Sequence, residues 1–224
     1  MTEQTQRVLA VDVGGSHVKM LLSGLDPPER RRFDSGPTMT AAQMVAGVLD
    51  ATKDWEYDVI SVGIPARVRD ERVVFEPVNL GGGWTGFDFE AAFGKPTKVV
   101  NDAVMQAIGS YEGGRMLFLG LGTGLGSALI FDGTVVPMEL GHLPYKKATY
   151  EDYVTETAVE RLGKKQWQKH VMRVVQVFDS AFGPDYVMLG GGASVQVDAA
   201  ILPDNVRIGH NANAFVGGFR LWIP

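Results

Sequence analysis

Short apolar runs separated by glycine-rich turns dominate the first third of this chain. Val8 to Val13 and Val18 to Leu22 have the composition of two strands, and Gly14-Gly15 breaks the run between them. The stretch RRRFDSG that follows can add a third strand. YDVISVGIP is a continuous apolar run that ends at Pro65, which predicts a strand buried on both faces.

Helical spacing appears in four other segments. Residues 40–52 place Met44, Val45, Val48 and Leu49 on one face, with Thr40 as the expected N-cap. The stretches TYEDYVTETAVERLG and KKQWQKHVMRVVQVFDSAF also predict helices, and NANAFVGGFRLW predicts a short closing helix.

The second half of the chain repeats the opening pattern. PTKVVNDAVMQAIGSY predicts a strand that changes to a helix at Asn101-Asp102. RMLFLGLGTGLGSALIFDGTVV then predicts a second strand, glycine turn and strand, and DYVMLGGGAS predicts a strand entering a glycine turn and a helix start. The strand–glycine turn–strand unit thus occurs at Asp12 to Lys19 and at Gly120 to Ser127, which predicts two facing halves of similar topology.

Composition narrows the class of protein. The 224 residues allow one large domain or two small ones, and the net charge of −5 does not indicate nucleic-acid binding, although it leaves room for a local basic groove. The absence of cysteine excludes disulfides, thiolate zinc sites and cysteine nucleophiles. No apolar run reaches transmembrane length, and the start MTEQTQRVLAVDV lacks the pattern of a secretion signal. We therefore expect a soluble, cytoplasmic protein that does not bind a membrane.

The two glycine turns are candidate phosphate sites. Without Cβ atoms, their backbone N–H groups can turn outward and cradle phosphate oxygens. DVGGSHVK adds Asp12, a carboxylate that could hold a hydrated Mg²⁺, and Lys19, while GLGTGLGS adds Thr123. The Walker pattern is absent, and the dinucleotide fingerprint does not fit because ALIF reads as a strand. The alternative is that both turns are ordinary tight hairpins.

An ordered set of motifs covers almost the whole chain: VDVGGSHVK, VGIP, NLGGGWTG, VVNDA, LGTGLGSALIFDG, ELGH, YVMLGGGAS and NAFVGGF. In this order they resemble the sugar kinases of the ROK family (repressors, open reading frames and sugar kinases), within the actin/hexokinase superfamily. The polyphosphate glucokinase branch is the most similar.

This resemblance implies an α/β fold with two facing ribonuclease-H-like domains and a central cleft. We expect domains at residues 1–113 and 114–211, with a final helix at about 212–222 packing back on the first. The implied phosphate-binding residues are Asp12, Gly14, Gly15, Ser16 and Lys19 in the first loop and Gly122, Thr123 and Gly124 in the second. Gly190, Gly191 and Gly192 match the adenosine-side turn of the family.

Asp102 matches the aspartate that, in the family, takes the proton from the attacking sugar hydroxyl. Its place at the start of a helix would keep the carboxylate ionised, because free N–H groups and the helix dipole favour an anion there. Phosphoryl transfer needs mainly positioning, a metal and donors for phosphate charge, so one base and two glycine loops are the expected parts. The alternative is that Asp102 or Asn101 is only an N-cap.

Glu139 and His142 in MELGH could hold a metal, perform acid–base chemistry or bind a polar ligand. In most ROK proteins the histidine of this motif belongs to or adjoins a zinc site completed by downstream cysteines. Here LPYKKATYEDY supplies none, so the resemblance implies no zinc site. A clamp on sugar hydroxyls is then the expected role, and a histidine satisfied inside the fold is the alternative.

Asn79 and Trp84 are expected to complete the sugar pocket together with Asn101, since an amide beside a flat aromatic suits a sugar ring. Trp84 could equally be a core or lid residue. The segment after GIP departs from the family, because Ala66-Arg67 stands where a glycine is usual. The chain is also short for the family, and no DNA-binding extension is seen, which disfavours a repressor.

The phosphoryl donor stays open between ATP and polyphosphate. LGGGAS favours ATP, whereas Lys146, Lys147, Lys164, Lys165 and Lys169 could line a groove for a chain of phosphates. Those lysines could also be an ordinary solvated face.

We expect a Mg²⁺-dependent kinase that phosphorylates the 6-hydroxyl of a hexose, with glucose first, and that can form a homodimer. The alternative is a non-catalytic sugar-binding or regulatory relative.

Overall fold

The computed structural model describes residues 6–223. Residues 1–5, which contribute to the expected absence of a secretion signal, lie outside the described part. The chain divides into two compact units, Met1–Met105 with Ala214–Pro224 (unit 1) and Gln106–Asn213 (unit 2). The division falls inside helix α3 (Asp102–Ser110), eight residues before the boundary that we expected after Gly113.

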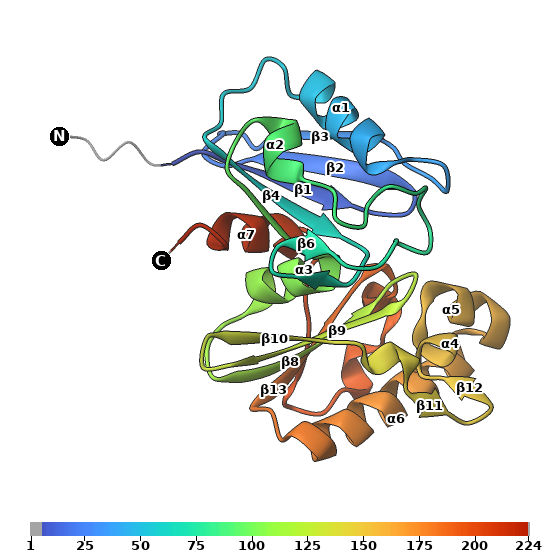
Figure 1. The fold of residues 1–224 in the computed structure, drawn as a ribbon. Coiled ribbons are helices and arrows are strands. Elements are labelled where there is room, and N and C mark those ends of the chain that lie inside the picture. Colours follow the sequence, from blue (N-terminus) through green and yellow to red (C-terminus); the bar gives the residue numbers. More distant parts are fainter. Residues whose placement is uncertain (1–5, 224) are drawn as a thin grey trace. The chain divides into compact units, whose positions relative to one another are not determined.

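Unit 1 is built on a mixed five-stranded sheet in the order β3-β2-β1-β4-β7 (Figure 1). Its strands β1, β2 and β3 pair antiparallel, whereas β1, β4 and β7 pair in parallel. The strands are β1 (Val8–Val13), β2 (His17–Leu22), β3 (Arg30–Asp34), β4 (Val59–Ile64) and β7 (Thr97–Asn101), with a small hairpin of β5 (Val68–Arg69) and β6 (Arg72–Val73).

Helices cover both faces of this sheet. Leu9 and Val11 point to the face covered by α1 (Ala41–Ala51) and α2 (Phe89–Phe93), where they join Met44 and Phe89 in one core. On the other face lies α7 (Asn213–Arg220), whose Gly218 packs against the Ala10 side chain so closely that a Cβ would meet it at 2.7 Å. The small residues at this contact allow α7 to lie directly on the sheet.

Unit 2 repeats the same topology with different residues. Its sheet has the order β10-β9-β8-β13-β14, with β8, β9 and β10 antiparallel and β8, β13 and β14 parallel. The strands are β8 (Arg115–Leu121), β9 (Leu125–Phe131), β10 (Thr134–Met138), β13 (Tyr186–Gly190) and β14 (Val206–Ile208). The predicted repeat of strand, glycine turn and strand is therefore confirmed as two equivalent sheets.

One face of the unit 2 sheet carries Leu117, Leu119, Val187 and Leu189, which pack against the helices. The remaining elements are α4 (Glu151–Val154), α5 (Glu156–Leu162), α6 (Lys164–Phe182), the hairpin of β11 (Pro144–Tyr145) and β12 (Ala148–Thr149), and the 3₁₀ helices η1 (Leu140–His142), η2 (Gly192–Gln196) and η3 (Ala199–Ile201).

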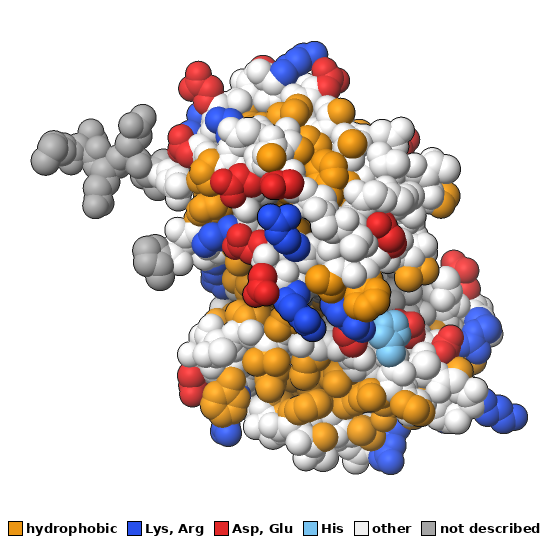
Figure 2. All heavy atoms as spheres, viewed as in Figure 1, with side chains coloured by type: hydrophobic (Ala, Val, Ile, Leu, Met, Phe, Trp, Pro, Cys, Tyr) orange, Lys and Arg blue, Asp and Glu red, His pale blue; other side chains and the backbone are white. Residues whose placement is uncertain are grey.

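The outer strand of this sheet is apolar. On the face shown in Figure 2, hydrophobic side chains gather over the unit 2 strands. Phe131 at the end of β9 and Val136 in β10 are exposed apolar residues. β10 lies at the edge of the sheet, and edge strands are where proline is tolerated, which accounts for Pro137.

Helix prediction succeeded where caps and periodicity agreed. Thr40 caps α1 in a complete capping box with Gln43, as expected. Met44, Val45 and Val48 are buried, but Leu49 is 38% exposed, so its place on the core face was wrong. The α2 helix was not predicted, because its five residues lie in a stretch rich in glycine and turn residues.

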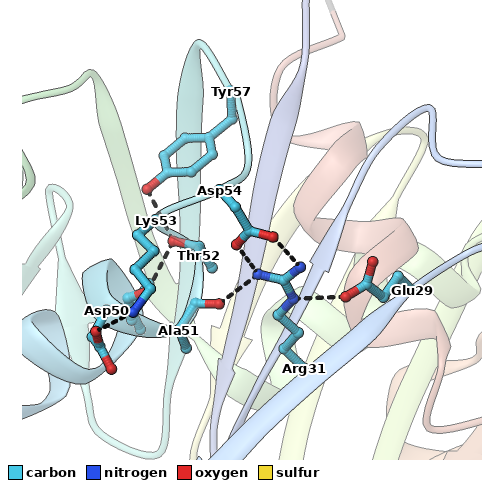
Figure 3. A network of polar contacts seen from close by, with 9 residues as sticks. Glu29, Arg31, Asp50, Ala51, Thr52, Lys53, Asp54 and Tyr57 are labelled. Carbon is cyan, nitrogen blue, oxygen red and sulfur yellow. Dashed lines mark hydrogen bonds and ion pairs between the residues drawn. The ribbon is translucent and has the colours of Figure 1, made fainter.

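A guanidinium joins the outer strand β3 to the end of α1 (Figure 3). Arg31 makes a two-point ion pair with the Asp54 carboxylate, donates to Glu29 at 2.7 Å and to the Ala51 carbonyl at 2.8 Å, and stacks 4.1 Å over the Trp55 ring. The Arg31 hydrogen bonds lower the pKa of Asp54 to about 2.

Among residues 6–223, no helix combines the length and the apolar character needed to cross a bilayer.

Candidate functional site

The first glycine turn of unit 1 is held by its own backbone and by Ser35, the residue that follows β3. The Gly14 N–H donates to the His17 carbonyl at 2.9 Å, and the Ser35 hydroxyl donates to the Gly14 carbonyl at 2.6 Å. The Ser35 N–H donates to the Ser16 carbonyl at 3.0 Å, while the Ser16 side chain is exposed. The turn is therefore pre-shaped, with its tip open to a ligand.

Asp12 lies at the carboxyl end of β1, where ligands of parallel sheets bind. Its side chain is 22% exposed, and its Oδ2 is 3.9 Å from Nζ of Lys19, the residue opposite on β2. Burial raises the pKa of Asp12, and the Lys19 charge opposes part of that rise. A carboxylate in this state gains from a nearby cation.

Asn101, rather than Asp102, caps α3. The Asn101 Oδ1 accepts N–H groups of Ala103 at 2.9 Å and Val104 at 3.2 Å, and its amide nitrogen donates to the Ala66 carbonyl at 3.1 Å. These bonds give Asn101 a role in shaping the turn. They also explain how the unusual Ala66-Arg67 segment is held, since it contributes a backbone carbonyl and no side chain to this contact.

Asp102 is the first residue of α3 and accepts the Ala103 N–H at 2.8 Å. Because Asn101 caps the N-terminus of α3, the Asp102 carboxylate is not needed as the helix cap. The alternative that Asp102 is only an N-cap is therefore weakened, and a chemical role for this carboxylate stays a proposal.

Gly63 adjoins the backbone of both Asp12 and Asp102. It is the β4 partner of Asp12 in the parallel register, and a Cβ built on Gly63 would come within 3.4 Å of the Asp102 Cα. The absence of a side chain lets α3 begin directly against β4. Asp12 and Asp102 thus share one end of the unit 1 sheet.

The loop that carries Asn79 packs beside the first glycine turn. A Cβ on Gly15 would touch the Asn79 Cβ at 3.4 Å, and the Asn79 side chain is exposed. Gly81 approaches the Thr38 carbonyl so closely that a Cβ would lie 2.6 Å away. The Glu76 carboxylate accepts the Thr85 and Trp84 N–H groups, each at 3.1 Å, and these bonds lower the pKa of Glu76.

Trp84 corrects one expectation. Its side chain is fully buried in the unit 1 core, and its indole N–H donates to the Met39 carbonyl at 3.3 Å. The ring is enclosed and its only hydrogen-bond donor is used, so Trp84 is a core residue. We therefore no longer include Trp84 in the candidate sugar pocket.

The second glycine turn, in unit 2, is also fixed from within. The Gly122 N–H donates to the Gly124 carbonyl at 3.1 Å, and the Gly122 carbonyl accepts the Glu156 N–H at 3.0 Å. Thr123 and Gly124 are exposed at the tip. The first residue of α5 is thereby tied to this loop.

The turn at residues 190–192 packs on the same loop. Gly191 has a φ of +78°, and a Cβ there would lie 2.6 Å from the Leu121 nitrogen. A Cβ on Gly192 would overlap the Glu156 carboxylate. Gly191 therefore cannot be replaced without moving backbone, and the two glycine-rich segments form one surface. The segment after them continues as η2 rather than as an α-helix.

Glu139, His142 and Glu151 form a polar cluster in unit 2. His142 Nε2 is 3.5 Å from Glu139 Oε2, and His142 Nδ1 is 3.4 Å from Glu151 Oε1. The side chains of Glu139 and His142 are 44% and 61% exposed. This exposure argues against the alternative of a histidine sealed inside the fold.

Ser127 positions this cluster. Its hydroxyl donates to the Met138 carbonyl at 2.9 Å and accepts the Leu140 N–H at 3.1 Å, which holds the MELGH segment against β9. The Glu151 Oε2 lies 3.3 Å from a Cβ built on Gly124 and 3.1 Å from one built on Gly141. Glu151 therefore adjoins both the second glycine turn and the cluster.

Sequence reasoning missed Glu151 and Glu156. Both residues occupy the first position of a short helix. In the sequence pattern, acidic residues at such positions indicate only the start of a helix. A signal existed in the spacing, because β-hairpin pairing returns MELGH to the glycine turn and the next helix starts shortly after. Among residues 6–223 no group of three or more acidic, histidine or cysteine side chains has the arrangement of a metal site.

Each unit has the ribonuclease-H-like topology, and two such units in one chain define the actin-like ATPase class of α/β proteins. The model of the ROK family matches residues 8–151, so the chain belongs to the ROK family.

Similar proteins include the polyphosphate glucokinase of Mycobacterium tuberculosis, which is 27% identical over 210 residues covering 84% of this chain and 78% of that protein. The inorganic polyphosphate/ATP-glucomannokinase of Arthrobacter sp. strain KM matches with a TM-score of 0.80 and 25% identity over 95% of this chain and 96% of that one. A ROK family glucokinase from Streptomyces griseus, in complex with glucose and AMPPNP, shares the fold with a TM-score of 0.75 at 17% identity, over 94% and 97% of the two chains.

Proposed function

We propose that this protein is a sugar kinase that transfers a phosphoryl group from polyphosphate or ATP to the 6-hydroxyl of a hexose, with glucose as the first candidate. The observation that carries the proposal is the position of Asp102. This carboxylate starts α3 without serving as its cap, and it shares the carboxyl end of the unit 1 sheet with Asp12. The relatives named above support the reaction class.

In the proposed reaction Asp102 accepts the proton of the sugar 6-hydroxyl. The hydroxyl oxygen forms a bond to the terminal phosphorus, and the bond from that phosphorus to the bridging oxygen of the donor breaks, with the electron pair leaving on the donor. A positioned base contributes about 10²–10⁴-fold to such a step. The remaining work is positioning and charge stabilisation, which suits glycine loops.

Glu139 and Glu151 are proposed to accept hydrogen bonds from sugar hydroxyls, and His142 to orient both. The support is geometric, since His142 lies within 3.5 Å of each carboxylate and Ser127 fixes the segment. A polyhydroxylated ligand matches two acceptors beside one ring. Asn79 is retained as a further sugar contact because it is exposed beside Gly15.

The two glycine turns are proposed to bind donor phosphates through their N–H groups, with Lys19 and Thr123 as side-chain donors and residues 190–192 at the far side of the donor. Asp12 fits Mg²⁺, because it is a largely buried carboxylate whose raised pKa a cation would oppose. When bound, Mg²⁺ would neutralise phosphate charge, and Asp12 would hold it through water.

A coupled assay for hexose 6-phosphate, run with ATP and with polyphosphate, tests this proposal. Turnover on either donor that requires Mg²⁺ is the expected result. Sugar binding without turnover on any hexose or donor would favour the alternative, a non-catalytic or regulatory member of the family.

A further inference from the structure

Unit 2 contains a groove that the proposed chemistry does not use. It has a volume of about 870 Å³ and lies between α6 and residues 201–205. Lys164, Lys165, Lys169 and Arg173 line it, and all four side chains are exposed. These cations stand out in a chain whose net charge is −5.

The cations are arranged in a row. Lys165, Lys169 and Arg173 follow each other at intervals of four, so they share one face of α6 and span about 12 Å along its axis. Like charges at this spacing repel, which costs helix stability unless an anion lies between them. The row therefore fits an elongated anion better than a compact one.

The start of α6 adds further positive charge to this row. Lys164 and Lys165 occupy the first turn, where the helix dipole disfavours cations, and no acidic residue is present there. Such a departure from helix preferences is typical of a functional position. The one carboxylate that lines the groove, Asp179, lies at the other end and accepts the Asn205 amide at 2.8 Å.

Ile201 and Pro203 make the opposite wall largely apolar, and Asn205 is its polar member. An apolar wall keeps water away from one side of the lysine row and strengthens attraction between its charges and an anion. Lysine stems can also lie along such a surface while their ammonium groups reach the ligand.

One short helix, α5, connects the second glycine turn to the start of the groove. The Glu156 N–H, at the start of α5, donates to the Gly122 carbonyl, and α5 has seven residues, about 10 Å of helix. Gly163 alone separates α5 from α6. A donor held at Gly122–Gly124 therefore needs only a short extension to reach Lys164 and Lys165.

We propose that this groove binds the distal part of a linear inorganic polyphosphate donor, beyond the phosphate that reacts. This inference rests on the proposed kinase function and assigns long-chain polyphosphate as the donor that gains most from it. Of the five lysines considered from the sequence, three line the groove. Lys146 instead lies over the rings of Tyr145 and Tyr153, at 5.8 and 5.7 Å.

The test is a triple variant, Lys165→Gln/Lys169→Gln/Arg173→Gln. Its matched control is Lys53→Gln/Lys95→Gln/Lys147→Gln, which removes three cations that do not line the groove. Direct binding of fluorescently labelled long-chain polyphosphate is measured by anisotropy over a range of salt. By analogy with other polyanions, losing three contacts should weaken binding at least tenfold and make the negative slope of log affinity against log salt less steep by about 2. Lys169→Gln alone should give a smaller loss in the same direction.

Steady-state kinetics provide the second readout. In the groove variant the KM for long-chain polyphosphate should rise at least tenfold, while the KM values for tripolyphosphate and for the sugar stay within about twofold of the wild type. Equal effects in the groove and control variants would overturn the proposal, as would a rise in the KM for ATP alone, which would assign the groove to a nucleotide. If the wild type binds polyphosphate but shows no kinase turnover, and the groove variant loses that binding, the groove proposal stands and the kinase proposal is rejected.

Discussion

Asp12 and Asp102 both adjoin Gly63, the first as its partner across the β1–β4 ladder and the second with its Cα 3.4 Å from the position of a Gly63 Cβ. One carboxylate is largely enclosed beside a lysine, and the other begins a helix that a neighbouring residue caps. Two carboxylates in such different surroundings can perform different tasks, one towards a cation and one towards a proton.

Replacing Asp102 tests the base. Asp102→Asn keeps the shape of the side chain but removes its ability to take a proton, so kcat should fall about 10²–10⁴-fold. Sugar binding measured by calorimetry should change little. Asp88→Asn, which alters the side chain that caps α2, serves as a control for loss of a carboxylate in the same unit. Near-normal turnover by Asp102→Asn would assign the base to another residue.

Asp12→Asn should separate stability from activity. The raised pKa means that the folded state binds this proton more tightly than the unfolded state, so the free energy of unfolding falls as pH rises from about 3.8 through the folded pKa. At pH 7 the ionised group therefore costs stability, and Asp12→Asn should raise the melting temperature. The difference should shrink as pH falls towards 4, because the wild-type carboxyl becomes protonated.

The same variant should lose about 10²-fold in turnover, the scale of a misplaced reacting group, and its dependence on Mg²⁺ should change. A lower melting temperature at pH 7 would show that the contact between Asp12 and Lys19 outweighs the cost of burial.

Glu139→Ala and Glu151→Gln test the sugar contacts. A hydrogen bond to a charged acceptor contributes about 1.5–3 kcal/mol, so each variant should raise the sugar KM about 10–100-fold. The donor KM should change far less, and discrimination between sugar epimers should weaken, because a site built around hydroxyls depends on each of them. A change confined to the donor KM would place these carboxylates elsewhere in the reaction.

Ser61→Ala tests how α7 is held on the unit 1 sheet. The buried Ser61 hydroxyl donates to the Gly218 carbonyl at 2.6 Å and accepts the Trp222 indole N–H at 2.9 Å. Removing it leaves both partners without this bond, which should lower the free energy of unfolding by about 1–3 kcal/mol in denaturant titration. Ser180→Ala, at an exposed position of α6, should have no comparable effect. Unchanged stability in Ser61→Ala would mean that water replaces the hydroxyl.

The sequence by itself determined the two-fold repeat, the strand and helix at Asn101-Asp102, and the cap at Thr40, because each depends on neighbours along the chain. Glycine between β-rich runs, a β-to-helix switch and a capping box are local signals. The ordered motifs also identified the family.

Only the tertiary structure decided which side chains are available. Trp84 has the same local pattern whether it lines a pocket or fills a core, and its burial depends on residues such as Met39 that are far away in the sequence. Glu151 and Glu156 meet the second glycine turn through packing between elements, and the row of Lys165, Lys169 and Arg173 becomes a groove only because residues 201–205 form its other wall. Periodicity specifies a face of a helix, whereas the surface that covers that face comes from long-range contacts.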